Sequence, residues 1–298
     1  MYDTRTPGAL PFALDGTTTA SYLWYTEKVG YLARRDPLGN TNEYAVPQYG
    51  QPNTSPQDVI LAPNGTPWFF DATGEKIGHA TTDGQIVEYN LGAALPAQGP
   101  DNLAVGPDGN IWFVGNGSTL TLGYVTSTGT VTLIALPFST YASPTLAFGS
   151  DGNAWITTGN SIIRVKRSGA VLNVYNFGAN YITRGPDGNV WVTENDAIAT
   201  IVPQGNVIKA FPIYFNVPNC PPSNSCSRSI GAITTGSDGA LWFAEGFGGI
   251  GRITTGGVYS EYQVFTPRTH PTDVSNNRDG NIWFVDSGAE KLGRVKIH

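Results

Sequence analysis

Acidic residues recur at one position relative to the tryptophans of this sequence. The third residue after a tryptophan is a carboxylate in five of the seven cases, and these residues are Glu27, Asp71, Glu194, Glu245 and Asp286. Carboxylate oxygens are the ligands that Mg²⁺ and Ca²⁺ prefer. We therefore name Glu245 and Asp286 as candidate ligands of a divalent metal and Glu194 as a candidate ligand-binding residue. The simpler interpretation is that each carboxylate accepts backbone N–H groups where a strand ends.

Histidine is the side chain best suited to act as a general base near pH 7, and the chain has three: His79, His270 and His298. His79 lies in a predicted strand where other repeats carry arginine, which indicates a place on the surface of a sheet. His298 is the last residue. His270 precedes a predicted strand of the last repeat and is the candidate catalytic base, with an ordinary polar loop residue as the alternative.

The two cysteines, Cys220 and Cys226, lie in one short segment, Cys-Pro-Pro-Ser-Asn-Ser-Cys. The gap of five residues is a small loop that a disulfide can bridge, and the nearby sequence lacks the further soft ligands of a metal site. We predict a disulfide inside an insertion loop at residues 216–229. A disulfide favours a secreted or cell-surface protein that has lost its leader, whereas free thiols would favour the cytoplasm.

These candidate residues can act together only if the fold brings them close in space. The spacing of the tryptophans indicates which fold this is. The tryptophans are spaced by 44, 44, 43, 36, 51 and 41 residues. The segment Asp-Gly-Asn-Ile-Trp-Phe-Val occurs at 108–114 and is repeated at 279–285. A period in the low forties with one tryptophan per unit is typical of a β-propeller. The long interval of 51 residues contains the cysteine loop.

Each repeat predicts four antiparallel strands. Asp-Gly pairs between apolar runs are strong hairpin signals, because glycine accepts positive φ. Aromatic and β-branched residues alternate with polar ones around the tryptophan and again in segments such as Ile250–Ile253, which reads Ile-Gly-Arg-Ile. Helical periodicity with caps is not found. We predict an all-β chain, with residues 1–298 forming a single seven-bladed propeller of four-stranded antiparallel blades.

The seventh repeat stops after its third strand, at His298. The missing outer strand has to come from elsewhere, because an open sheet edge invites association. We predict that the segment from Tyr2 to about Pro7 supplies it and closes the ring.

The alternation of strand directions places further carboxylates on the same side as the acidic positions after tryptophan. Asp58, Asp101 and Asp273 lie near the start of the first strand of their repeats. Residues at that end form one rim of a propeller, which we call the top face. We therefore add Asp101 and Asp273 to Glu194 as candidate ligand-binding residues.

Composition excludes several classes of function. The chain has 17 basic and 23 acidic residues, for a net charge of −6, so nucleic acid is not an expected partner. An uninterrupted apolar run long enough for a transmembrane helix is not present. Aromatic residues make up 11% of the chain, which excludes a disordered protein.

The repeated sequence motif resembles that of the virginiamycin B lyase family of seven-bladed propellers over essentially the whole chain. The resemblance rests on Asp-Gly-x-Ile-Trp-Phe, on a carboxylate three residues after tryptophan, and on Ile-Gly-Arg-Ile. It implies a magnesium-dependent enzyme that linearises cyclic depsipeptides by elimination across an ester C–O bond. Glu245 and Asp286 occupy the position, three residues after tryptophan, at which the family has a carboxylate. In the family, a histidine follows the residue that begins the first strand of a blade. In this chain, Gly231 and Thr272 occupy the two corresponding positions.

Three functions therefore remain open. The protein binds a small molecule, peptide or protein at an acidic top face; or it is a metal-dependent C–O lyase with His270 as base and Mg²⁺ or Ca²⁺ as cofactor; or it is a structural assembly module. The missing histidines favour binding. The sequence does not fix the oligomeric state.

Overall fold

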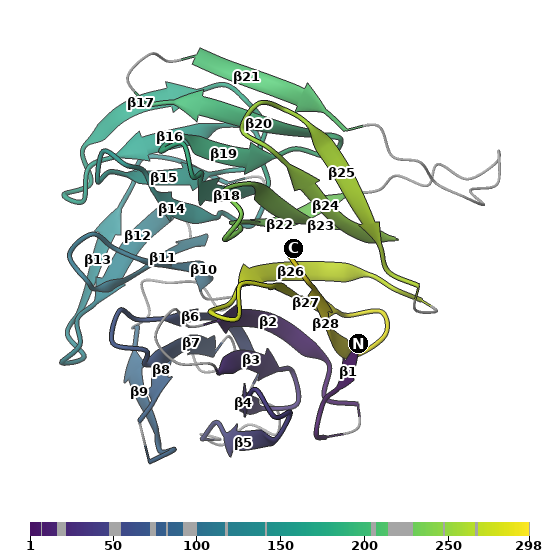
Figure 1. Cartoon of the computed structure of the whole chain (residues 1–298). Coiled ribbons are helices and arrows are strands. Elements are labelled where there is room, and N and C mark those ends of the chain that lie inside the picture. Colours follow the sequence, from purple (N-terminus) through teal and green to yellow (C-terminus); the bar gives the residue numbers. More distant parts are fainter. Residues whose placement is uncertain are drawn as a thin grey trace.

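The structure is a computed structural model, and it describes residues 1–6, 8–16, 22–47, 55–71, 76–81, 83–91, 100–116, 119–140, 142–203, 207–213, 229–246, 248–265 and 268–297. Only the backbone of residues 100, 101 and 207 is described. Seven four-stranded antiparallel sheets surround a central axis (Figure 1). The predicted all-β, seven-bladed propeller is confirmed. The described part of the chain contains no helix that is long and apolar enough to cross a membrane.

The first strand of each blade lies at the axis and contacts the first strands of both neighbouring blades. These inner strands are β2 (Pro11–Gly16), β6 (Pro56–Leu61), β10 (Pro100–Val105), β14 (Leu146–Phe148), β18 (Tyr181–Arg184), β22 (Ile230–Thr235) and β26 (Pro271–Asn276).

The second strand of each blade carries the tryptophan. These strands are β3 (Leu23–Glu27), β7 (Pro67–Asp71), β11 (Ile111–Asn116), β15 (Ala154–Thr157), β19 (Val190–Thr193), β23 (Leu241–Glu245) and β27 (Ile282–Asp286). The third strands are β4 (Tyr31–Arg35), β8 (Lys76–Ala80), β12 (Leu120–Val125), β16 (Ile162–Val165), β20 (Ala197–Val202), β24 (Gly249–Ile253) and β28 (Lys291–Val295).

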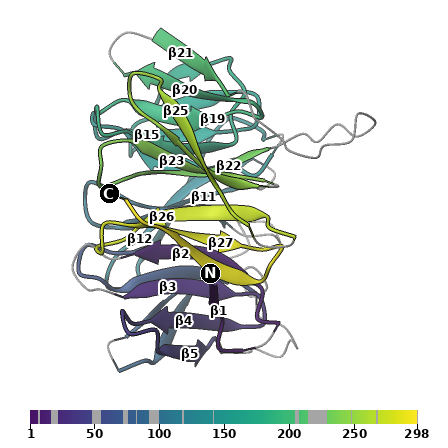
Figure 2. The same ribbon diagram turned by 45° about the vertical axis from the view of Figure 1, so that its right-hand side comes forward.

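The outer strands of blades 1 to 6 follow their blades in sequence, and blade 7 takes its outer strand from the N-terminus. They are β5 (Thr41–Ala45), β9 (Ile86–Asn90), β13 (Val131–Ala135), β17 (Val171–Tyr175), β21 (Val207–Pro212), β25 (Tyr259–Gln263) and β1 (Tyr2–Asp3). Tyr2 pairs with Leu292 and Asp3 with Lys291, so the first strand of the chain lies beside its last strand, β28 (Figure 2). The predicted ring closure is confirmed, with Tyr2–Asp3 as its paired part.

One hydrophobic layer fills each boundary between blades. Successive residues of a strand point to opposite faces, so a tryptophan and the residue after it pack toward different neighbours. Trp68 packs with Phe113 of the next blade, and Trp283 packs with Tyr25 across the ring closure. The repeated Trp-Phe pair therefore allows each blade to bury both of its faces.

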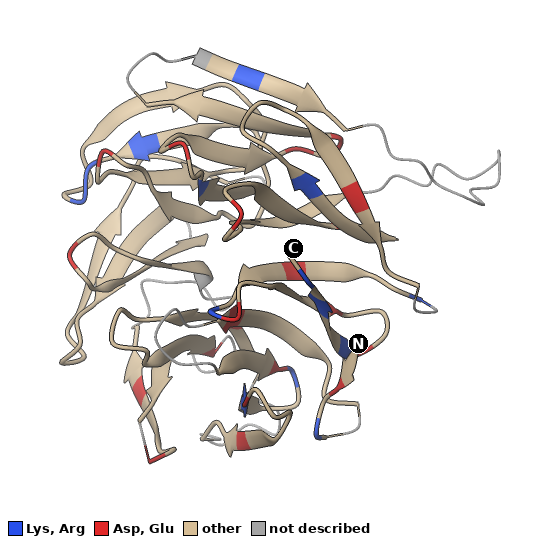
Figure 3. Cartoon of the chain, in the orientation of Figure 1, with Lys and Arg blue, Asp and Glu red and all other residues tan. Residues whose placement is uncertain are grey.

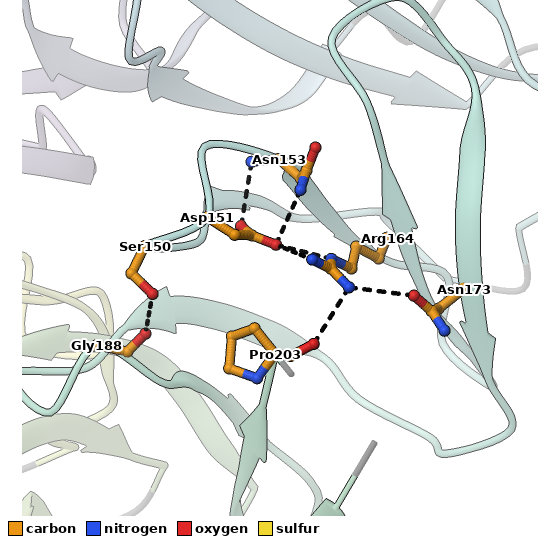
Figure 4. Close-up of polar contacts among 7 residues, drawn as sticks. All are labelled: Ser150, Asp151, Asn153, Arg164, Asn173, Gly188 and Pro203. Carbon is orange, nitrogen blue, oxygen red and sulfur yellow. Dashed lines mark hydrogen bonds and ion pairs between the residues drawn. The ribbon is translucent and has the colours of Figure 1, made fainter. Parts of the chain in front are cut away.

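The aspartates of the Asp-Gly turns bind mainly inside their own blades, and Asp108 also binds Arg167 of the next blade at 3.2 Å. Asp187 accepts the indole N–H of Trp191 at 3.0 Å, and Asp238 accepts that of Trp242 at 3.0 Å. In blade 4 the equivalent Asp151 binds Arg164 of the third strand instead, at 2.6 Å (Figure 4). These carboxylates stabilise the turns and lie at the opposite end of the inner strands from the top face.

Several of these turns are preceded by a glycine, and the requirement for glycine there is steric. A Cβ atom on Gly185 would clash with the indole ring of Trp191. We predict that Gly185→Ala lowers the free energy of unfolding by roughly 1–3 kcal/mol, as overpacking does. Thermal unfolding would measure this. Gly256→Ala is the control, because its nearest neighbour would be Thr254 Oγ1 at 3.7 Å. Equal melting temperatures for the two variants would contradict the explanation.

Candidate functional site: the central channel and its acidic rim

A cavity of about 450 Å³ lies on the propeller axis, and the inner strands of all seven blades line it. Its most prominent polar side chains are the carboxylates of Asp15, Asp58 and Asp273, which come from blades 1, 2 and 7. Arg184 lines it from blade 5. In this cavity, acidic residues from three blades face a common space.

The position of each carboxylate in its inner strand explains why it faces the channel. Asp58 and Asp273 directly precede the buried aliphatic residue of their strands, and Asn102 occupies the same place in blade 3. Asp15 lies one residue beyond the buried Leu14. Alternation along a strand then turns all four side chains toward the axis.

Each of these side chains also ties its blade to the next one. A side-chain oxygen accepts the backbone N–H of the neighbouring inner strand in four places: Asp273 from Leu14 at 2.9 Å, Asp15 from Leu61 at 2.9 Å, Asp58 from Leu103 at 2.6 Å and Asn102 from Leu146 at 2.9 Å. The channel carboxylates are therefore structural acceptors as well as sources of charge.

The protein around the channel makes these carboxylates hard to ionise. Burial raises the pKa of Asp15 to about 6 and the pKa values of Asp58 and Asp273 to about 7. Repulsion between the three charges acts in the same direction. Burial and the charges of Asp273 and Asp58 also raise the pKa of the Tyr181 hydroxyl, so this phenol belongs to the same electrostatic site.

The carboxylates that follow the tryptophans do not line this cavity. Glu27, Asp71, Glu245 and Asp286 are almost completely buried, and they lie between blades at the top ends of the second strands. Glu245 accepts the hydroxyl of Tyr259 at 2.7 Å, and Tyr259 belongs to the outer strand of the same blade. Their burial follows from the strand alternation, which turns them toward a neighbouring blade rather than toward the axis.

Asp286 has several hydrogen-bond donors within its own blade. It accepts the Thr269 hydroxyl at 2.7 Å, the His270 N–H at 2.7 Å and the Ala289 N–H at 3.1 Å. This is the backbone-capping role that the sequence left open. The described residues contain no group of three or more His, Cys, Asp and Glu suited to a metal ion. The assignment of Glu245 and Asp286 as metal ligands, and of Mg²⁺ or Ca²⁺ as cofactor, therefore stays a prediction.

His270 lies half-buried at the top face, directly before β26. Its ring Nδ1 is 3.3 Å from the Ser287 hydroxyl, while its Nε2 is 3.5 Å from the place of a Cβ atom on Gly246 in blade 6. The imidazole thus points from blade 7 toward blade 6. His79 instead packs against Trp68, with tilted rings whose centroids are 4.6 Å apart, as expected for a residue on the face of a blade.

The remaining predicted residues are placed as follows. Glu194 lies half-buried at the top of blade 5, where burial and the neighbouring Asp196 raise its pKa. The side chain of Asp101, the disulfide candidates Cys220 and Cys226, and nearly all of the predicted 216–229 loop lie outside the described residues. The sequence-based site list omitted Asp15, Asp58 and Tyr181. Their place beside a buried aliphatic residue of the first strand is the signal that identifies them.

The fold and its channel define the class of protein: a seven-bladed β-propeller with an acidic axial cavity. The model of the virginiamycin B lyase family matches residues 2–178 and 160–298, and the chain belongs to this family.

Relatives and solved structures agree with this assignment. The chain is 37% identical to a virginiamycin B lyase of Nocardia farcinica over 118 residues, which are 39% of this chain and 38% of that protein. It superimposes on a streptogramin B lyase with a TM-score of 0.85 and 26% identity, covering 100% of this chain and 96% of that one.

A catalytically inactive histidine-to-alanine variant of virginiamycin B lyase from Staphylococcus aureus, crystallised with quinupristin, is also similar. Its TM-score is 0.85 at 26% identity, with 99% of this chain and 98% of that one covered.

Proposed function

We propose that this propeller binds a ligand at its top face, over the acidic axial cavity, and does not catalyse elimination. The observation that carries the proposal is the axial cavity, where Asp58 and Asp273 from two blades face one space and their charges act on the Tyr181 hydroxyl of a third blade. Carboxylates and a phenol in a partly enclosed space favour a ligand that carries donor groups or positive charge. Cyclic depsipeptides of the streptogramin B type are the ligand class to test first, because the chain belongs to their lyase family.

The arrangement of histidines supports binding without catalysis. The resemblance to the family places a histidine where Gly231 and Thr272 stand. A Cβ atom on Gly231 would lie 3.2 Å from the Thr272 carbonyl oxygen and 3.3 Å from the Ala244 Cβ. A larger side chain at residue 231 therefore requires its surroundings to shift.

The alternative function is a metal-dependent C–O lyase, and the placement of His270 favours it. The imidazole stands at the rim between blades 6 and 7, with its Nδ1 next to Ser287 and its Nε2 directed toward blade 6. A neutral imidazole there can take the proton of a carbon acid while the ester oxygen leaves as a carboxylate. The inactive variant of the Staphylococcus aureus enzyme carries a histidine-to-alanine change, which makes a histidine the residue to test here.

The proposal also covers the location of the protein, its partners and its assembly. A secreted or surface location is consistent with the acidic, charge-poor composition. Basic residues are spread over several blades (Figure 3), so the proposal includes no nucleic-acid partner. A purely structural module is the outcome if the top face binds nothing.

The decisive experiment incubates the protein with quinupristin and Mg²⁺, then follows thermal stability and the chromatographic state of the antibiotic. We expect a saturable rise in melting temperature and intact antibiotic. Asp273→Asn should weaken binding about tenfold, equivalent to about 1.4 kcal/mol, while the exposed control Glu290→Gln should not.

Two outcomes contradict the proposal. A ring-opened isomer that forms with the wild type and disappears with His270→Ala would establish the lyase instead. An unchanged melting temperature at saturating antibiotic would remove the depsipeptide as ligand.

A further inference from the structure

Blade 1 contains a buried carboxylate that has no partner. Glu27 is 0% exposed, and neither of its carboxylate oxygens has a hydrogen-bond partner among the described residues. The Oε1 atom of Glu43 is buried in the same way, while its Oε2 accepts the Thr6 hydroxyl at 2.9 Å. Burying an ionised carboxylate without a partner is costly, so a group that compensates the charge is expected here.

The two carboxylates share one space. Glu27 and Tyr25 lie two residues apart in β3 and therefore face the same side of the sheet. Glu43 of β5 stands opposite Ala33 of β4, which stands opposite Tyr25. The charges of Glu27 and Glu43 both act on Tyr25, and that of Glu43 acts on Glu27. This face packs against blade 7 at the ring closure.

Blade 2 has the same pair of carboxylates and shows what fits between them. Asp71 and Glu88 occupy the registers of Glu27 and Glu43. There, Lys76 stands opposite Asp71 in the strand register, and its ammonium group binds Glu88 at 3.1 Å. The residue in the register of Lys76 is Tyr31 in blade 1, which supplies no charge.

The cationic side chains near the blade 1 pair contact other groups. The Lys28 ammonium lies 4.5 Å from the ring centroid of Phe12, and the Arg35 guanidinium lies 4.8 Å from that of Tyr2. Neither forms an ion pair with Glu27 or Glu43 among the described residues. Burial and the charge of Glu43 raise the pKa of Glu27 to about 8. The site therefore holds either a proton or another cation near neutral pH.

We propose that blade 1 binds a hard metal cation between Glu27 and Glu43, in the place that the Lys76 ammonium occupies in blade 2. Carboxylate oxygens select hard cations, and two carboxylates match the charge of a divalent ion such as Ca²⁺. The site is separate from Glu245 and Asp286 and from the channel. Because it lies where blade 1 meets blade 7 and the N-terminal segment, its occupation stabilises the closed ring.

The test compares melting temperatures of the full chain in a chelator, in Ca²⁺, in Mg²⁺ and in K⁺. We expect a saturable rise of several degrees for the wild type with one of these ions. Glu27→Gln removes the unpaired charge, so it should melt above the wild type in the chelator and lose the response to the metal. Tyr31→Lys supplies the ammonium group of blade 2, and we expect the same two results.

The control variant is Glu290→Gln, an exposed residue of blade 7, which should keep the wild-type response. The proposal is overturned if no ion changes the melting temperature of the wild type, or if Glu27→Gln keeps the response. A response that survives Glu27→Gln and disappears with Asp286→Asn would place the cation at blade 7 instead. None of these readouts depends on ligand binding at the channel.

Discussion

Lys76→Met is expected to lower the free energy of unfolding by about 3–5 kcal/mol, the cost of breaking a buried ion pair by removing one partner. The Lys76 and Glu88 side chains are only 11% and 6% exposed. Burial raises the pKa of Glu88 even with the ammonium present. Without Lys76, Glu88 loses its ion-pair partner and stays buried within reach of the charge of Asp71. Thermal unfolding at pH 7.5 should show the loss as a fall of about 10 °C.

Lys291 provides a matched control. It stands opposite Asp286 in blade 7, in the same register as Lys76 opposite Asp71, but it is 36% exposed and its partner Asp3 is 82% exposed. Exposed pairs contribute about 0–1 kcal/mol, so Lys291→Met should have a small effect. Lowering the pH to 5 should restore part of the stability of Lys76→Met, because the carboxylates then take up protons. Equal losses for the two variants would contradict the explanation.

Asp58→Asn is expected to remove the contribution of one of several raised carboxyl groups to the pH dependence of stability between pH 5 and pH 8. The folded-state pKa values of Asp58 and Asp273 are about 7 and that of Asp15 is about 6, against 3.8 for an ordinary aspartate. The folded state therefore holds protons that the unfolded state has released. The stability from these groups is fully present below pH 4 and is lost as the pH rises through 6 to 7.

Asparagine keeps the structural role of this residue. Asn102 already accepts the Leu146 N–H at 2.9 Å in the equivalent place of blade 3, so Asp58→Asn should keep the hydrogen bond from Leu103. At pH 8 the variant should be more stable than the wild type by on the order of 2 kcal/mol, and at pH 5 the two should converge. Melting temperatures across this range measure the effect. A wild type that becomes more stable as the pH rises from 5 to 8 would contradict the assigned pKa values.

The first of these predictions reflects a general property of this fold. A propeller blade buries both of its faces, so a carboxylate at the end of a second strand lies between two blades and needs a partner. Blade 2 supplies a lysine, blade 6 supplies the Tyr259 hydroxyl, and blade 7 supplies backbone and hydroxyl donors to Asp286. Blade 1 supplies none of these to Glu27 among the described residues, which is why the cation is proposed there.

The sequence predicted the site less well than it predicted the architecture. It placed Asp273 at the start of an inner strand, and the structure places that carboxylate in the channel. It also grouped Glu245 and Asp286 at one acidic rim, whereas in the structure both are buried and have partners inside their own blades. Strand alternation turns these side chains toward a neighbouring blade, but their partners are distant in sequence and no local pattern specifies them.

The sequence by itself determined the number of blades, the order of the strands, the hairpin turns and the closure of the ring by Tyr2–Asp3. These features follow from local chemistry that recurs seven times: Asp-Gly turns, alternation with a period of two, and one strand missing from the last repeat. Only the tertiary structure decided which acidic residues share a space. Asp58 meets Asp273 and Tyr181 across the axis, and Glu27 meets Glu43 across a blade, because packing brings together residues that are distant in sequence.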